Sequence, residues 1–126
     1  MPNPRRADRL SESIREFAAT FLTENIKDPR VVGLVTVTAV DVTQDMRHAK
    51  IFVSIMGTDD ERKKTMEGLV SATGHLRSRI AKALTLRFAP EIEFREDRSV
   101  ERAARIETLL AKIKDGAPVA DEDPID

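Results

Sequence analysis

Cysteine, tryptophan and tyrosine are absent from this 126-residue sequence. Without cysteine the chain can form no disulfide, offers zinc no thiolate ligand and has no thiol nucleophile. Its apolar runs are far shorter than the ~20 residues that a membrane-spanning helix needs, and its first residues lack the apolar segment of a signal peptide. We therefore expect a cytoplasmic protein that has no contact with a membrane.

The phosphate-binding and metal-binding motifs of common enzymes are also missing. The five glycines are too widely dispersed for a phosphate-binding loop or a dinucleotide-binding turn. The two histidines, His48 and His75, are 27 positions apart and belong to different expected elements. This spacing suggests neither a metal site nor a catalytic triad. A small enzyme is thus the weakest functional hypothesis, and the sequence predicts no cofactor and no metal.

The net charge of −1 conceals an asymmetry along the chain. Residues 115–126 contain five acidic residues and no lysine or arginine, which predicts a disordered acidic tail. Removing these five negative charges leaves +4 for residues 1–114, which we expect to form one domain. The window 62–87 holds seven lysines and arginines against one acid, Glu67. It is a candidate polyanion-binding face, with an ordinary solvated surface as the alternative.

Hydrophobic periodicity predicts an α+β fold with the order α-β-β-α-kink-α-β-α. The expected elements are a helix at about 4–25, strands at 31–42 and 50–56, a helix beginning after Thr58, a second helix after Ala72-Thr73-Gly74, a strand at 91–95 and a helix at about 100–114. Thr58 and Glu61 have the spacing of a capping box. Gly74 is expected to supply the kink and Ser99 to cap the last helix. The result is a three-stranded sheet with helices on one face, followed by a C-terminal helix.

The helix after Gly74 carries the strongest functional pattern. At 100° per residue, His75, Arg79 and Lys82 fall within about 60° of one another, beside an apolar stripe. Such a row can bind a phosphate backbone, although a solvated helix face explains it equally well. With no tyrosine or tryptophan, and most phenylalanines at expected core positions, base stacking is not expected. RNA recognition would then depend on phosphates, riboses and the shape of structured RNA.

Three segments of the chain form a distinctive set in their order and spacing. They are Ile26-Lys27-Asp28-Pro29-Arg30 leading into Val35-Thr36-Val37-Thr38; Asp45-Met46-Arg47-His48-Ala49-Lys50-Ile51-Phe52-Val53-Ser54; and Leu76-Arg77-Ser78-Arg79-Ile80 through Leu86-Arg87-Phe88-Ala89-Pro90-Glu91-Ile92-Glu93-Phe94. Together they resemble the ribosome-binding factor A family of bacterial small-subunit assembly factors. The resemblance extends over about residues 5–113.

The resemblance implies a type II KH-like fold in which the third strand lies beside the first. In this family an Ala-x-Gly kink replaces the Gly-x-x-Gly loop of ordinary KH domains; Ala72-Thr73-Gly74 matches that kink, and the chain contains no Gly-x-x-Gly. The family implies a non-enzymatic factor that binds the free or immature 30S ribosomal subunit around the neck region of its 16S rRNA. Late rRNA processing, cold adaptation and release by ribosome-associated GTPases are implied in the same way. A single small domain without a long apolar edge is expected to be monomeric.

The candidate site residues fall into three basic groups and the kink. The RNA-binding candidates are Arg77, Arg79, Lys82 and Arg87 on or near the basic helix; Arg5, Arg6 and Arg9 at the N-terminus; and Arg47, His48 and Lys50 in the hairpin, with Ala72, Thr73 and Gly74 forming the kink. The main alternative is a basic KH-like module that binds an acidic protein partner. Salt weakens both kinds of complex, so sensitivity to RNase is what separates them.

Overall fold

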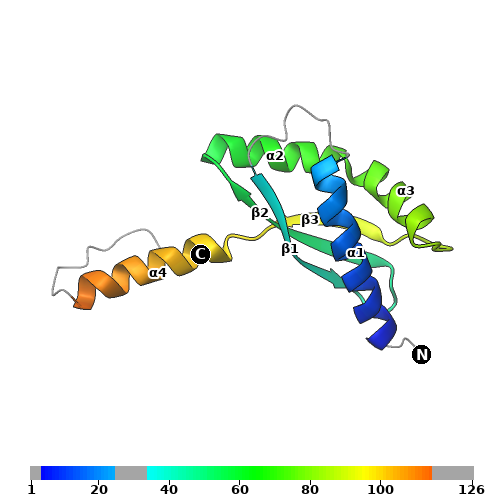
Figure 1. The fold of residues 1–126 in the computed structure, drawn as a ribbon, viewed down its shortest axis with the longest axis horizontal. Helices are drawn as coiled ribbons and strands as arrows, with labels where there is room; N and C mark the ends of the chain where they lie inside the picture. The colour runs from blue at the N-terminus through cyan, green and yellow to red at the C-terminus, as the bar shows by residue number, and fades with distance from the viewer. Residues whose placement is uncertain (1–3, 25–33, 115–126) are drawn as a thin grey trace.

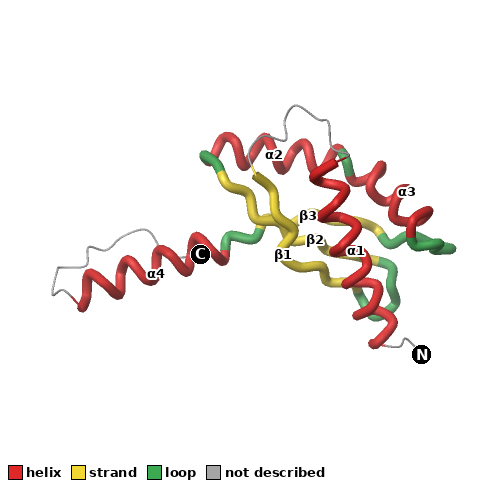
Figure 2. The backbone as a smooth tube through the Cα atoms, viewed as in Figure 1, coloured by secondary structure: helices red, strands yellow, loops and turns green. Residues whose placement is uncertain are grey.

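Residues 4–24 and 34–114 are described by the computed structural model, and their elements follow the order that the periodicity predicts (Figure 1, Figure 2). The elements are α1 (Pro4–Glu24), β1 (Leu34–Val42), β2 (His48–Met56), α2 (Asp59–Ser71), α3 (Thr73–Ala83), β3 (Glu91–Glu96) and α4 (Ser99–Lys114). The family-like segment at 26–30, the expected strand start at 31–33 and the expected tail at 115–126 lie outside the described residues. The division into a domain and a tail therefore stays a prediction.

Strand β2 is the centre of the sheet. It pairs antiparallel with β1 and parallel with β3, so the strand order is β1-β2-β3. The expectation that the third strand lies beside the first is therefore wrong. The inward side chains of β2, from Ala49 to Ile55, are all buried. The backbone N–H and C=O groups of this central strand find their hydrogen-bond partners in the strands on both sides. Helices α2 and α3 provide the long crossover that the parallel pairing with β3 requires.

A β-bulge keeps the valines of β1 on the core face. The register of β1 against β2 shifts between Val37 and Ala39. Because side chains alternate along a strand, Val35 and Val37 can share a face with Val40 and Val42 only if one extra residue lies between the pairs. All four valines belong to or pack against the core. The switch of the valines from odd to even positions is visible in the sequence, but the prediction of one uniform strand overlooked it.

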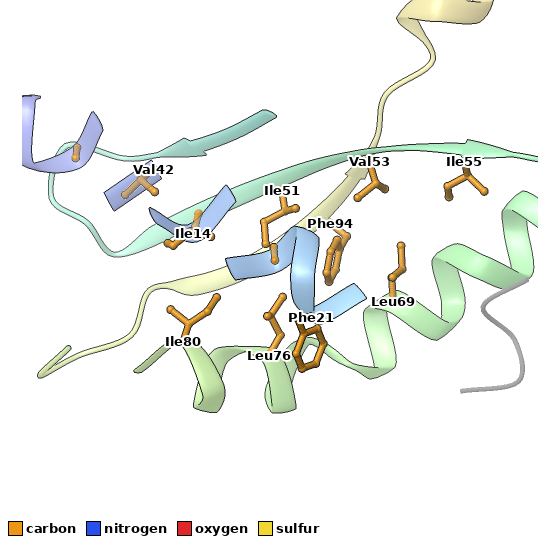
Figure 3. Packing of buried hydrophobic residues seen from close by; sticks show 13 residues of the cluster. Ile14, Phe21, Val42, Ile51, Val53, Ile55, Leu69, Leu76, Ile80 and Phe94 are labelled. Carbon is orange, nitrogen blue, oxygen red and sulfur yellow. The ribbon is translucent and has the colours of Figure 1, made fainter. Parts of the chain in front are cut away.

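Helices α1, α2 and α3 cover one face of the sheet, as predicted, and enclose a single apolar core (Figure 3). Its completely covered side chains include Ile14 and Phe21 from α1, Ile51 and Val53 from β2, Leu69 from α2, and Leu76 and Ile80 from α3. The opposite face of β2 is more exposed and carries His48 and Lys50. The sheet therefore has one covered face and one open face.

The predicted cap of α2 is confirmed, and that of α4 is wrong. The Glu61 backbone N–H donates to the Thr58 hydroxyl, and the Thr58 N–H donates to the Glu61 carboxylate at 2.8 Å. Gly57 precedes this box with a φ of 155°, and a Cβ there would lie 3.1 Å from the Glu61 side chain, which explains the glycine. At α4, Ser99 is already helical and its N–H donates to the Asp97 carboxylate at 2.9 Å. Asp97 thus takes the capping role, because its carboxylate accepts the otherwise free N–H of the first helical residue.

The two middle helices are separated at Ala72, inside the segment where the sequence indicates a kink. Ala72 has φ −86° and ψ −5°, and the Thr73 hydroxyl donates to the Val70 carbonyl at 2.8 Å. Gly74 lies in the first turn of α3 without a positive φ, and a Cβ on it would meet no atom within 4 Å beyond its chain neighbours and the backbone of its own helix. The expectation that Gly74 supplies unusual backbone angles is therefore wrong. The threonine hydroxyl, which competes for the backbone carbonyl, accompanies the break instead.

Helix α4 extends away from the rest of the chain (Figure 1). Its periodicity predicts an amphipathic helix, and the helix is present. Its apolar side, however, is not covered by the other described elements: Ile106, Leu110 and Ile113 are 44%, 58% and 59% exposed.

Candidate nucleic-acid interface

A hollow of about 740 Å³ lies where three segments distant in sequence meet. These are the first turns of α1, the turn between β1 and β2, and the connection from α3 to β3. Its basic lining consists of Arg6, Arg47, His48, Arg77 and Arg87, and its acidic lining of Asp45 and Glu91. Four arginines against two carboxylates make this end of the sheet electropositive, which favours an anionic ligand.

The hollow gathers half of the RNA-binding residues that the sequence predicts. Arg6, Arg47, His48, Arg77 and Arg87 line it. The remaining candidates do not: Arg79 and Lys82 are exposed on α3, Arg5 and Arg9 are exposed on α1, and Lys50 is exposed on the open face of β2. RNA contact by any of the ten stays a prediction. The structure nevertheless divides them into a convergent group and residues that lie apart from it.

The turn between β1 and β2 holds Arg47 and His48 through a local hydrogen-bond network. The Thr43 hydroxyl donates to the Asp45 carboxylate at 2.6 Å, and the backbone N–H of Arg47 donates to the same carboxylate at 3.0 Å. These two hydrogen bonds, the Thr43 bond first, lower the pKa of Asp45 below its ordinary value. Met46, at the centre of the turn, has a φ of 60°. The turn is therefore ordered by its own bonds, and the Asp45 charge is largely satisfied by them.

Arg77 stabilises the side of the hollow that is formed by the connection from α3 to β3. Its guanidinium donates to the Ala89 carbonyl through Nη2 at 2.9 Å, and its Nη1 lies 3.5 Å from the Glu91 carboxylate. The backbone N–H of Glu91 donates to the Arg47 carbonyl at 2.8 Å, which joins this side of the hollow to the β1–β2 turn. Arg77 thus has a structural role that sequence reasoning did not predict, because its partners are 12 and 14 positions away in the chain.

Phe88 is the residue that sequence reasoning missed. It lines the hollow, and 83% of its surface is exposed, whereas Phe21 and Phe94 lie in the core. Phe88 is thus the phenylalanine that departs from the expected core placement, while the expectation about base stacking stays a prediction. The signal that could have found Phe88 is local: it lies beyond the helical stripe of α3 and before the buried Pro90, so neither the helix nor the strand directs it inward.

Arg62 begins the basic window 62–87 but takes no part in a basic surface. Only 9% of it is exposed, and its guanidinium pairs with Glu96 at 3.2 Å, with Glu101 at 2.8 Å and with Asp59. It lines a second hollow, of about 780 Å³, between α2 and the segment after β3. The prediction that this window forms one polyanion-binding face is therefore wrong at Arg62, because the fold surrounds it with carboxylates.

Neither a metal site nor a membrane span is found in the described part of the chain. No group of three His, Asp or Glu side chains there is placed to hold a metal ion. No described helix combines the length and the apolar character needed to cross a membrane.

The fold and this hollow define an α+β domain, four helices with a three-stranded mixed sheet, that has a basic surface at one end of the sheet. The same fold occurs in a Thermotoga maritima protein solved by NMR, with a TM-score of 0.65 and 39% identity, over 77% of this chain and 92% of that one. The crystal structure of ribosome-binding factor A from Thermus thermophilus gives a TM-score of 0.61 at 22% identity, over 71% and 94% of the two chains. The predicted fold class is therefore confirmed.

Sequence comparison identifies the family. The family model described as Ribosome-binding factor A matches residues 6–110. Ribosome-binding factor A of Gemmatimonas aurantiaca is 60% identical over 115 residues, covering 91% of this chain and 79% of that protein, and the Halothermothrix orenii protein is 46% identical over 110 residues, covering 87% and 89%. The chain belongs to the ribosome-binding factor A family, as the three segments indicate.

Proposed function

We propose that this protein is a ribosome assembly factor that binds the immature 30S subunit through its 16S rRNA and supports late maturation of that RNA. The observation that carries the proposal is the hollow in which Arg6, Arg47 and Arg87 converge from three segments of the chain. Side-chain cations gathered at one place bind the phosphates of a folded RNA, whereas cations spread around a domain do not form such a site.

The family supports the choice of the ribosome as target. The matching family is described as Ribosome-binding factor A. A Thermus thermophilus member has been fitted as a homology model into a cryo-EM map of its complex with the 30S subunit; it has the same fold, with a TM-score of 0.61 and 23% identity. We extend this target to the present chain, and with it action at the neck region, in the cytoplasm and as a monomer without enzymatic activity. Release by a ribosome-associated GTPase and a role in cold adaptation belong to the same proposal.

Co-sedimentation with purified immature and mature small subunits tests the proposal. The informative variant is Arg47→Glu/Arg87→Glu, which reverses two charges of the hollow without touching the bonds of Arg77 to its own loop. Its matched control is Lys112→Glu/Lys114→Glu, the same change of charge on exposed residues of α4. We expect selective binding to the immature particle, lost in the first variant and retained in the second. A third variant, Arg79→Glu/Lys82→Glu, measures how much the exposed side of α3 contributes to binding of the particle.

The remaining outcomes separate the alternatives. Equal loss in the hollow variant and the α4 control would mean that net charge rather than the hollow governs binding. Association that survives digestion of the rRNA would favour an acidic protein partner. For a phosphate-binding site, affinity should fall with salt, and each lost contact should reduce the log–log slope by about 1.

A further inference from the structure

We propose that the basic hollow takes a single unpaired nucleotide of the RNA, with its base stacked on Phe88 and its phosphate among the surrounding arginines. The inference rests on the proposed function and names the ligand of that site. It differs from binding to a helical phosphate backbone, because a stacked base must leave its own helix to reach the ring.

Phe88 has the exposure that a stacking platform requires. With 83% of its surface exposed, it is the most exposed of the large hydrophobic side chains among the described residues. The hollow that it lines also holds four arginines, whose cationic side chains can bind the phosphate of a nucleotide. An exposed aromatic ring within a cationic groove is the arrangement by which proteins bind unpaired nucleotides.

The backbone around Phe88 is held on its C-terminal side. The next residue, Ala89, has its carbonyl bound by the Arg77 guanidinium at 2.9 Å, and Pro90 is completely buried. Beyond them, the N–H of Glu91 is bound to the Arg47 carbonyl at 2.8 Å. The ring is therefore presented from an anchored segment, which lowers the entropy that must be lost when a base stacks on it.

The hollow has the size and the lining for one nucleotide. Its volume of about 740 Å³ falls within the roughly 300–1,000 Å³ of small-ligand sites. Leu10, Met46 and Leu86 give it an apolar, half-buried part, on which a base can lie.

Some of the basic side chains that line the hollow can bind a phosphate. The Asp45 carboxylate accepts from Thr43 and Arg47, and the Glu91 carboxylate is near Arg77. Both acidic groups of the lining therefore already have partners within the protein. Three cations of the lining form no ion pair with either carboxylate in the described part of the chain: the side chains of Arg6, Arg47 and Arg87.

The absence of tryptophan from the chain provides a direct test. In the Phe88→Trp variant the indole is the only one in the protein, so subtracting a parallel titration of the tryptophan-free wild type leaves the signal of the hollow alone. On titration with immature small subunits we expect strong quenching by base stacking, together with protection from acrylamide. The matched control is Leu110→Trp, at a position 58% exposed on α4, which should show neither effect to the same extent.

A series of substitutions separates stacking from simple apolar contact. Phe88→Tyr and Phe88→Trp keep an aromatic ring, whereas Phe88→Leu and Phe88→Ala do not. We expect the last two to weaken particle binding at least about fivefold, the lower limit for loss of one base–aromatic stack. All four should fold, since the ring is exposed, and circular dichroism checks this.

Each other outcome overturns a defined part of the proposal. Normal binding with unchanged indole emission from the Phe88→Trp variant, or leucine as effective as phenylalanine, overturns the inference and leaves the proposed function intact. A blue shift without quenching indicates contact with protein and also overturns it. If the wild-type protein binds neither particle, the proposed function fails and the inference fails with it.

Discussion

Arg62 on α2 and Glu101 on α4 form an ion pair of 2.8 Å between helices, although the two residues are 39 positions apart in sequence. The same guanidinium pairs with Glu96 at 3.2 Å and donates to the Gly57 carbonyl at 3.3 Å. One nearly buried arginine therefore joins the start of α2, the end of β3 and the start of α4. It is the principal polar connection that we find between α4 and the other described elements.

Replacing Arg62 with methionine should destabilise the protein by about 1–3 kcal/mol, because several hydrogen bonds to a charged group are lost at once. Urea unfolding measures the change. The control is Arg15→Met, which removes an exposed pair with Glu12 and should have a much smaller effect. Equal effects of the two substitutions would show that the Arg62 cluster contributes no more than a surface ion pair.

Truncation of Leu69 and of Leu110 should have very different effects. Leu69 is completely buried in the core, so Leu69→Ala should cost about 2–5 kcal/mol. Leu110 is 58% exposed on α4, so Leu110→Ala should remain within about 0.5 kcal/mol. Thermal and urea unfolding of the isolated protein provide both values. A large cost at Leu110 would mean that the apolar side of α4 is covered in solution.

The capping box of α2 should contribute measurably to stability. Thr58→Ala removes the acceptor of the Glu61 N–H and should cost about 1 kcal/mol. Thr58→Ser keeps an acceptor oxygen and should restore most of the loss. If serine and alanine were equally destabilising, the contribution of Thr58 would come from its methyl group and not from the cap.

Stability should fall in acid through Asp97. Hydrogen bonds from the backbone and side chain of Ser99, followed by one from the Thr38 hydroxyl, lower the pKa of Asp97. A lowered pKa means that the folded state favours the ionised carboxylate, so this stabilisation is present above the ordinary pKa and is lost as the pH falls through the lowered value.

The matched substitution is Asp97→Asn, which keeps an acceptor oxygen but has no charge. The melting temperature of the wild type should exceed that of the variant at neutral pH, and the difference should close toward about pH 2. A difference that stays constant over this range, or grows in acid, would contradict the assignment.

Local patterns along the chain predicted the elements well. The boundaries of the helices and the capping box at Thr58 depend on residues within a few positions of one another, and such signals survive in the folded protein. The prediction failed for the distant pairing of β3, and also for two local features, the bulge in β1 and the cap of α4. Strand β3 pairs with β2 rather than β1, and Asp97 caps α4 while also accepting from Thr38, 59 positions away.

The candidate site, too, could be predicted from the sequence only in part. Its arginines could be named from the sequence, since residue type alone identifies cations. Their roles could not: Arg62 is enclosed by three carboxylates, Arg77 holds the Ala89 carbonyl, and Phe88 is exposed although phenylalanine is usually a core residue. For Arg62 and Arg77 most of the partners are distant in the chain, whereas the exposure of Phe88 follows from its place between α3 and the buried Pro90.

The sequence by itself determined the order of the elements, the covered face of the sheet and the family, because periodicity, capping and motif spacing are properties of neighbouring residues. Only the tertiary structure decided the strand order, the exposed side of α4 and the hollow at the end of the sheet. These depend on which segments pack together, and packing brings Arg6, Arg47 and Arg87 to one place from three separate parts of the chain. The chemistry of the site is thus present in the sequence, and its geometry is a product of the fold.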